Sequence, residues 1–133
     1  MRAIRSRSAD SRQFSIASTS LAISCRTRGT EIVVSVCGEV DAANAKEFAH
    51  SVREASGSRS GLVLDLSEVP FLAFDGVSAL YAISAHLLRE DVPWCVVASP
   101  AVSRVLRLCD PERLIPLAGV VPPPQRRTGL NPA

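Results

Sequence analysis

The chain has 133 residues, the usual length of one domain, and 47% of them are apolar, which is enough material for a hydrophobic core. Charged residues make up 21% and the formal net charge is only +2, which argues against a nucleic-acid partner because such domains usually carry a concentrated basic surface. No apolar run approaches the roughly 18 residues that a membrane-spanning helix needs, so we expect a cytoplasmic protein that has no membrane partner.

The two ends of the chain differ in composition from its centre. Residues 1–18 are rich in serine and arginine with little periodicity, which predicts a flexible tail. Residues 122–133 begin with three prolines, which predicts a second, extended tail. Residues 19–121 between them form the one predicted domain.

The first part of this domain indicates two strands and a helix. Residues 21–25 and 32–37 are mostly apolar or β-branched and flank a turn at residues 28–30, which favours an antiparallel hairpin. Asp41 is a good N-cap for the helix that follows. The apolar face of that helix, at helical spacing, consists of Ala45, Phe48, Ala49 and Val52.

Two strand–helix units and a last strand follow. Residues 62–66 and 94–98 have the pattern of buried strands, and residues 114–117 predict a short final one. Ser99 and Pro100 are typical of a helix start. The helix before them has one apolar side, formed by Val77, Leu80, Tyr81, Ser84, Leu87 and Leu88. The order strand, strand, helix, strand, helix, strand, helix, strand predicts an α/β fold with a mixed, mostly parallel β-sheet and amphipathic helices.

The sequence lacks the common motifs of enzyme sites. It contains no Gly-x-Ser-x-Gly, no phosphate-binding loop and no Gly-x-Gly-x-x-Gly, and His50 and His86 each stand alone within a helix. The four cysteines have no metal-ligand spacing, and three of them fall in strand-like runs where a buried thiol is expected. The four cysteines of the chain are Cys25, Cys37, Cys95 and Cys109. We therefore expect a protein that is not an enzyme and that holds no cofactor and no metal.

Three strand-to-helix turns resemble those of STAS domains, the family that includes the bacterial anti-sigma factor antagonists. Gly-Glu-Val-Asp at residues 38–41 resembles the family's Gly-Glu-Leu-Asp opening. Residues 64–72 resemble its central strand and loop, and residues 99–102 resemble the start of its last helix. The resemblance covers about residues 20–118. It implies a STAS-like regulatory protein that binds an anti-sigma factor and so frees a sigma factor.

The sequence departs from the family at the loop that carries its regulation. The family usually continues Asp-Ser-Ser-Gly or Asp-Ser-Thr-Gly, and its first serine is phosphorylated by an anti-sigma factor that is also a kinase. Here Ala73, Phe74 and Asp75 stand at the first three positions, and only Gly76 matches. Phe74 has no hydroxyl, so the resemblance implies binding without the usual phosphorylation control.

The resemblance also implies a partner-binding surface at this loop and at the corner before the first helix. The residues expected there are Glu39, Asp41, Leu72, Ala73, Phe74, Asp75 and Gly76. Phe74 is expected either to anchor a partner at the surface or to fold into the core. Asp75 either imitates a phosphate charge or only caps the helix. Gly76 is expected to allow close approach of a partner or a tight turn.

Two other functions stay open at this point. One is a STAS module that senses a ligand or binds a protein without acting on a sigma factor. The other is a phosphotransfer protein that uses Asp75 as the acceptor, although Ala73 removes the most obvious neighbouring acid for Mg²⁺.

Overall fold

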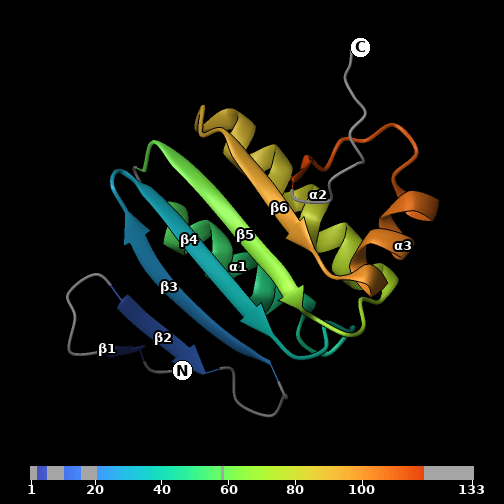
Figure 1. The fold of residues 1–133 in the computed structure, drawn as a ribbon, viewed down its shortest axis with the longest axis horizontal. Helices are drawn as coiled ribbons and strands as arrows, with labels where there is room; N and C mark the ends of the chain where they lie inside the picture. Colours follow the sequence, from blue (N-terminus) through green and yellow to red (C-terminus); the bar gives the residue numbers. More distant parts are fainter. Residues whose placement is uncertain (1–2, 6–10, 16–20, 58, 119–133) are drawn as a thin grey trace.

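The computed structural model describes residues 3–5, 11–15, 21–57 and 59–118, and its strands form one sheet (Figure 1). The strands are β1 (Ala3–Arg5), β2 (Ser11–Ser15), β3 (Ala22–Arg28), β4 (Glu31–Cys37), β5 (Gly61–Glu68), β6 (Trp94–Ala98) and β7 (Leu117–Ala118). The helices are α1 (Ala45–Ser56), α2 (Phe74–Arg89) and α3 (Pro100–Cys109).

The strands lie in the sheet in the order in which they occur in the chain. β1 to β4 are joined as antiparallel neighbours, and β4 to β7 are parallel neighbours joined through α1, α2 and α3. The predicted hairpin and the predicted parallel strands are both present, so the α/β class and the mixed sheet are confirmed. Parallel strands need such helical crossovers because a short turn cannot return the chain to the same end of the sheet.

The structure corrects the prediction for the N-terminal residues. Residues 3–5 and 11–15, for which the sequence predicts a flexible tail, form β1 and β2, and β2 pairs with β3. Without them β3 would be an edge strand, whose backbone groups can pair with almost any extended segment. Because this pairing uses main-chain hydrogen bonds, a serine- and arginine-rich sequence carries little signal for it. The predicted tail at residues 122–133 lies outside the described residues.

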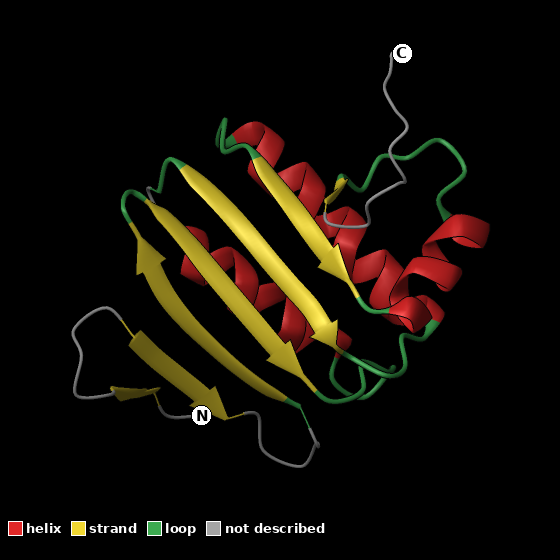
Figure 2. Ribbon diagram, in the orientation of Figure 1, coloured by secondary structure: helices red, strands yellow, loops and turns green. Residues whose placement is uncertain are grey.

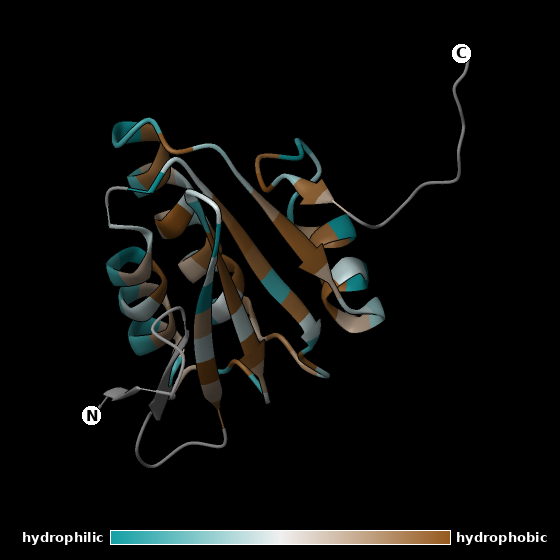
Figure 3. Cartoon of the chain, turned by 60° about the vertical axis from the view of Figure 1, so that its left-hand side comes forward, coloured by the Kyte–Doolittle hydropathy of each residue, from teal (hydrophilic) through white to brown (hydrophobic). Residues whose placement is uncertain are grey.

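The hydrophobic core lies between one face of the sheet and the helices α1 and α2, which cover that face (Figure 2). Alternate side chains along the central strands point into it, as the two-residue period of a strand dictates. From β4 and β5 these are Ile32, Val34, Val36, Leu62, Leu64 and Leu66. Phe48 of α1 and Leu80 of α2 are fully buried against them. The strands are accordingly coloured mostly as hydrophobic in Figure 3, whereas the helices carry both hydrophobic and hydrophilic residues.

Helix α2 begins at Phe74, and its apolar side is narrower than predicted. Its buried apolar side chains are Val77, Ala79, Leu80, Ile83 and Leu87. Leu88, which the sequence places on the same side, is exposed, and Tyr81 and Ser84 are only half-buried. Leu88 follows Leu87 by about 100° around the helix, which is enough to leave the buried stripe. Within the described residues, no helix is both long and apolar enough to cross a membrane.

The cysteines differ in burial more than the sequence suggests. Cys25 is buried and Cys95 and Cys109 are half-buried, but Cys37 is exposed. The prediction of a buried thiol is therefore wrong for Cys37. This residue ends β4 and follows the buried Val36 in the alternation of the strand, so its side chain lies on the outer side.

Asp110 holds the chain where it leaves α3. Its side chain is buried, and its carboxylate oxygens accept hydrogen bonds from the backbone amides of Leu114 (3.0 Å) and Ile115 (2.9 Å). The hydroxyl of Tyr81 lies 3.1 Å from the same carboxylate and donates to the carbonyl of Cys109 at 2.9 Å. Burial, followed by the neighbouring Asp110 carboxylate, raises the pKa of Tyr81 above its ordinary value of 10.0.

We expect Asp110→Asn to destabilise the protein by about 1–3 kcal/mol, because one buried backbone amide loses a charged acceptor. Denaturant unfolding of the two proteins measures this difference. The same substitution should move the pKa of Tyr81 back toward 10.0, which ultraviolet titration resolves cleanly because the chain contains one tyrosine. An unchanged tyrosine titration would show that Asp110 does not act on the Tyr81 hydroxyl in solution.

Candidate functional site

The candidate site lies at the carboxyl ends of β4, β5 and β6. In open sheets with parallel strands, function concentrates at this edge because the loops that leave the strands meet there. Residues 38–44 follow β4, residues 69–73 follow β5, and Ser99 follows β6. All of the residues that the sequence proposes for partner binding belong to the first two loops or to the start of α2.

Backbone hydrogen bonds join the first two loops into one unit. The amide of Val40 donates to the carbonyl of Phe71 at 3.0 Å, and the amide of Ala73 donates back to the carbonyl of Val40 at 2.9 Å. Val40 and Leu72 thereby form a short parallel bridge beyond the named strands. The corner at residues 39–41 and the loop before α2 therefore form one continuous surface. The sequence indicated only that both loops follow strands of the same sheet and did not show that they are bonded to each other.

Asn44 fixes the corner, and sequence reasoning did not identify it. Its side chain is only 1% exposed; its amide nitrogen donates to the carbonyl of Glu39 at 3.0 Å, and its amide oxygen accepts from the backbone amide of Asp41 at 3.0 Å. Asp41 in turn accepts from the amide of Ala43 at 2.9 Å. The prediction of Asp41 as N-cap is corrected, because α1 begins at Ala45 and Asp41 caps the turn that precedes it. An Asp followed three residues later by Asn, directly before an apolar helical pattern, was the available signal.

Ser99 connects the third loop to the second. Its hydroxyl donates to the carbonyl of Val69 at 2.6 Å and accepts from the amide of Val102 at 3.1 Å. It is the N-cap of α3, as the sequence predicts, and it also pins the loop that leads to Phe71. Since Ser99 is buried, the loop is supported from within the fold rather than from the surface.

Two phenylalanines project from this supported loop. Phe74 is 74% exposed and Phe71 is 49% exposed, although phenylalanine is usually buried. The alternative in which Phe74 folds into the core is therefore wrong. Phe74 is the first residue of α2, and the N-cap residue Ala73 makes no side-chain capping bond. Asp75 lies exposed in the first turn of α2, where its negative charge interacts favourably with the positive end of the helix dipole. It is not the N-cap residue.

Leu72 and Gly76 lie beneath the surface rather than on it. Leu72 is 3% exposed and packs in the core. A Cβ atom at Gly76 would meet the side chain of Leu72 and would lie 3.0 Å from Cγ1 of Val40. The expectation that Gly76 serves a tight turn or the approach of a partner is thus corrected: the glycine allows α2 to pack closely on the bridge between the two loops. Both residues position the surface and do not face a partner.

We call the accessible part of these loops the edge surface. It consists of Glu39, Asp41, Glu68, Phe71, Ala73, Phe74 and Asp75. Four of these seven residues carry carboxylates, and residues 38–41 and 67–76 contain neither lysine nor arginine. The edge surface therefore combines two exposed aromatic rings with a negative charge. Such a surface is suited to a partner that has an apolar pocket within a basic surround.

The edge surface gives little support to metal binding or to phosphotransfer at Asp75. Within the described residues, no group of three or more His, Cys, Asp and Glu side chains is placed to hold a metal ion. Asp75 stands beside Ala73 and Phe74, so neither sequence neighbour on this side offers a second carboxylate for Mg²⁺. What the edge surface offers is contact area held on a rigid support.

Comparison with known proteins agrees with this architecture. Residues 22–122 match the model of the STAS domain family. A crystal structure of an anti-sigma factor antagonist from Mycobacterium paratuberculosis is 31% identical, with a TM-score of 0.69 over 79% of this chain and 91% of that one. The anti-sigma factor antagonist SpoIIAA in its unphosphorylated form shares the fold at 14% identity, with a TM-score of 0.59 over 72% of this chain and 87% of that one.

A curated relative carries a different name. Osmosensory protein A of Mycobacterium tuberculosis is 38% identical over 90 residues, which is 65% of this chain. The match spans 57% of the length of that relative. The match leaves much of that relative without a counterpart in this chain.

Proposed function

The chain belongs to the STAS domain family, and we propose that it is a regulatory protein of the anti-sigma factor antagonist type, which acts by binding and not by catalysis. The binding unit is residues 19–121, and the edge surface makes the contact. In the cytoplasm it sequesters an anti-sigma factor, which frees a sigma factor and raises transcription.

The exposure of Phe74 is the observation that carries this proposal. Phe74 is 74% exposed at the first position of α2, so its ring adds little to the stability of the folded monomer. An exposed ring in a fixed position is, however, the kind of aromatic anchor that dominates protein interfaces. The bonds of Asn44 and Ser99 hold the loops in place before binding, so little conformational entropy is lost when a partner docks. The similarity to the anti-sigma factor antagonist of Mycobacterium paratuberculosis supports the choice of an anti-sigma factor as partner.

We further propose that binding is not controlled by phosphorylation at the family's position. That position holds Phe74, and a phenyl ring cannot accept a phosphoryl group. In the family, a phosphate dianion at this place would repel a packed interface and add a desolvation penalty. Without that switch, the amount of the free protein and of its partner would set the degree of sequestration.

Titration calorimetry of the full chain against the purified anti-sigma factors of its organism tests the proposal. We expect one of them to bind, and size-exclusion chromatography should then show release of sigma factor from a preformed sigma–anti-sigma complex. If the full chain, folded by circular dichroism, bound none of these factors, the proposed function would be wrong. Binding without release of sigma factor would instead identify an interaction module that does not act on a sigma factor.

The charge of the edge surface should control the speed of association. We expect Glu39→Gln combined with Asp75→Asn to lower the association rate constant about tenfold at low salt, because electrostatic steering contributes at least that factor. The difference should nearly vanish in about 1 M salt, where the Debye length is about 3 Å. Glu54→Gln combined with Glu90→Gln is a matched control, since it removes two exposed charges elsewhere. Stopped-flow kinetics that showed equal effects for both pairs would contradict a local role of the edge charges.

A further inference from the structure

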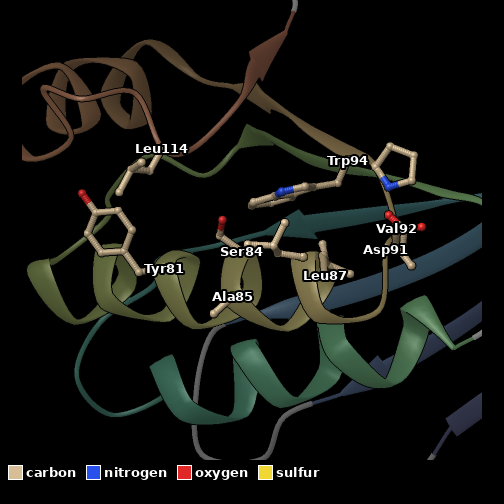
Figure 4. Close-up of a pocket in the computed structure, with 10 residues that line it drawn as sticks. Tyr81, Ser84, Ala85, Leu87, Asp91, Val92, Trp94 and Leu114 are labelled. Carbon is tan, nitrogen blue, oxygen red and sulfur yellow. The ribbon is translucent and has the colours of Figure 1, made fainter.

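An open apolar groove lies away from the edge surface, between α2, the start of β6 and the segment that follows α3 (Figure 4). Its volume is about 880 Å³. The residues that line it include Tyr81, Leu88, Asp91, Trp94 and Leu114. Figure 4 shows Trp94 extending over Ser84 and Leu87 of α2, with Tyr81 and Leu114 at the far end.

The groove is a surface that the fold itself leaves incompletely covered. Leu88 and Leu114 are exposed apolar side chains, and Trp94 and Tyr81 are only half-buried. Leu88 lies fourteen residues along α2 from Phe74, which is about 21 Å at 1.5 Å per residue. The far end of the groove, at Leu88, is therefore well separated from Phe74 along the helix.

We propose that residues 119–133 of the same chain dock in this groove. The segment begins directly after Ala118, the last residue of β7, and Leu114 only four residues earlier already lines the groove. It contains Pro122–Pro124, and proline-rich segments bind grooves lined by aromatic side chains because their extended helix is formed before binding. The groove offers the indole of Trp94 and the phenol of Tyr81 for that purpose.

The length of the segment is sufficient for this path. Ala118 pairs with Val97, three residues beyond Trp94 on β6, so the chain must return about 10 Å along the strand direction. Any six residues in a polyproline helix span about 19 Å, at about 3.1 Å per residue, so the six residues up to Pro124 are long enough for the docking that we propose. Because β7 runs parallel to β6 and away from Trp94, docking requires a reversal of direction after Ala118, and the sequence offers a glycine, Gly119, at that point.

The charges of groove and segment are complementary. Asp91 is the one charged residue among those that line the groove, and Glu90 beside it is also exposed. Arg126 and Arg127 follow the prolines directly after Gln125. Arg89 lies nearby in sequence and is exposed, so the local balance is one basic residue against two acidic ones. If the prolines packed on Trp94 and Tyr81, Arg126 and Arg127 would come close to the end of the groove at Asp91.

Fluorescence of the full chain tests this proposal, because Trp94 is its one tryptophan. We expect replacement of Pro122, Pro123 and Pro124 together by serine to expose the indole, which shifts its emission to longer wavelength and increases its quenching by acrylamide. Leu88→Ser should weaken docking in the same way, and combining it with the serine variant should add no further change, since both remove one interaction. Asp91→Asn, which tolerates the left-handed backbone at φ 59°, should weaken docking by about two- to fivefold.

Leu108→Ser is the matched control, since Leu108 is an exposed leucine of α3 outside the groove and should leave Trp94 unchanged. Emission and quenching that are identical in the wild-type and triple-serine chains would overturn the proposal. A difference that appears only at high protein concentration would also overturn it, in favour of a second copy of the chain. The proposal would also be overturned if Trp94 in the wild-type chain became protected from acrylamide only after a small molecule was added. None of these outcomes bears on the edge surface, which the same variants leave intact.

Discussion

Replacing Phe74 by alanine should weaken binding to the anti-sigma factor by about 30- to 1000-fold, which corresponds to about 2–4 kcal/mol at an aromatic hot spot. The residue is 74% exposed in the free protein, so loss of the ring removes little intramolecular packing. The free energy of unfolding should therefore change by less than about 0.5 kcal/mol, as for other surface substitutions. Calorimetric titration and denaturant unfolding of the same preparation separate the two effects.

Leu108→Ala provides the matched control for this experiment. Leu108 is 79% exposed, close to the exposure of Phe74, but it lies on α3 and outside the edge surface. The Leu108→Ala variant should bind the anti-sigma factor with the affinity of the wild type. Phe71→Ala should give a smaller loss than Phe74→Ala, since its ring is already half-covered by the protein. Equal affinities for the wild type and the Phe71→Ala, Phe74→Ala double variant would exclude the loop from the interface.

Phe74→Ser extends the same prediction to regulation. It removes the ring and restores a hydroxyl at the position where the family carries its phosphorylated serine. With a kinase-type anti-sigma factor and ATP, intact mass should rise by about 80 Da, one phosphoryl group, in the serine variant but not in the wild type. A phosphorylated wild-type chain would mean that another residue has taken over the switch.

The strands and helices were predictable wherever burial imposes a period on the sequence. β4, β5 and β6 carry Val and Leu on the face that packs against α1 and α2, and the predicted strand at residues 94–98 has the observed bounds of β6. The start of α3 was equally clear, because Ser99 and Pro100 each suit one position of a helix start. β1 and β2 were missed because an added edge strand needs backbone groups more than particular side chains.

The candidate site was predictable in its location but not in its construction. The resemblance led to residues 38–41 and 72–76, and the structure brings these segments together through the bonds between Val40, Phe71 and Ala73. Such bonds join main-chain atoms and leave no trace in residue type. The direction of Phe74 was equally hidden, since an aromatic residue suits both a core and an interface. Asn44 and Ser99 were not proposed as site residues because their partners lie in loops whose paths only the fold determines.

Gly76→Ala should destabilise the protein by about 1–3 kcal/mol, which is the usual range for a methyl group forced into a packed site. The added Cβ would overlap the side chain of Leu72 and crowd Cγ1 of Val40, and both of these residues are buried and cannot move freely. Helix propensity acts in the opposite direction, since alanine is about 1 kcal/mol better than glycine within a helix. The direction of the measured change therefore decides between packing and propensity. A domain of this size should lose about 4–8 °C of melting temperature per kcal/mol.

Two companion variants make the origin of this effect visible. Ser78→Ala, two residues further along the exposed side of α2, carries the same alanine without the contact and should be neutral or slightly stabilising. Leu72→Ala alone should cost about 2–5 kcal/mol as a core truncation, but combined with Gly76→Ala it should cost less than the sum, because the smaller side chain makes room for the new methyl group. Additive costs would show that the two residues do not compete for the same space. Because Leu72 lies between Phe71 and Ala73 in the loop that Val40 holds, Gly76→Ala should also weaken anti-sigma binding, which distinguishes it from a substitution that only lowers stability.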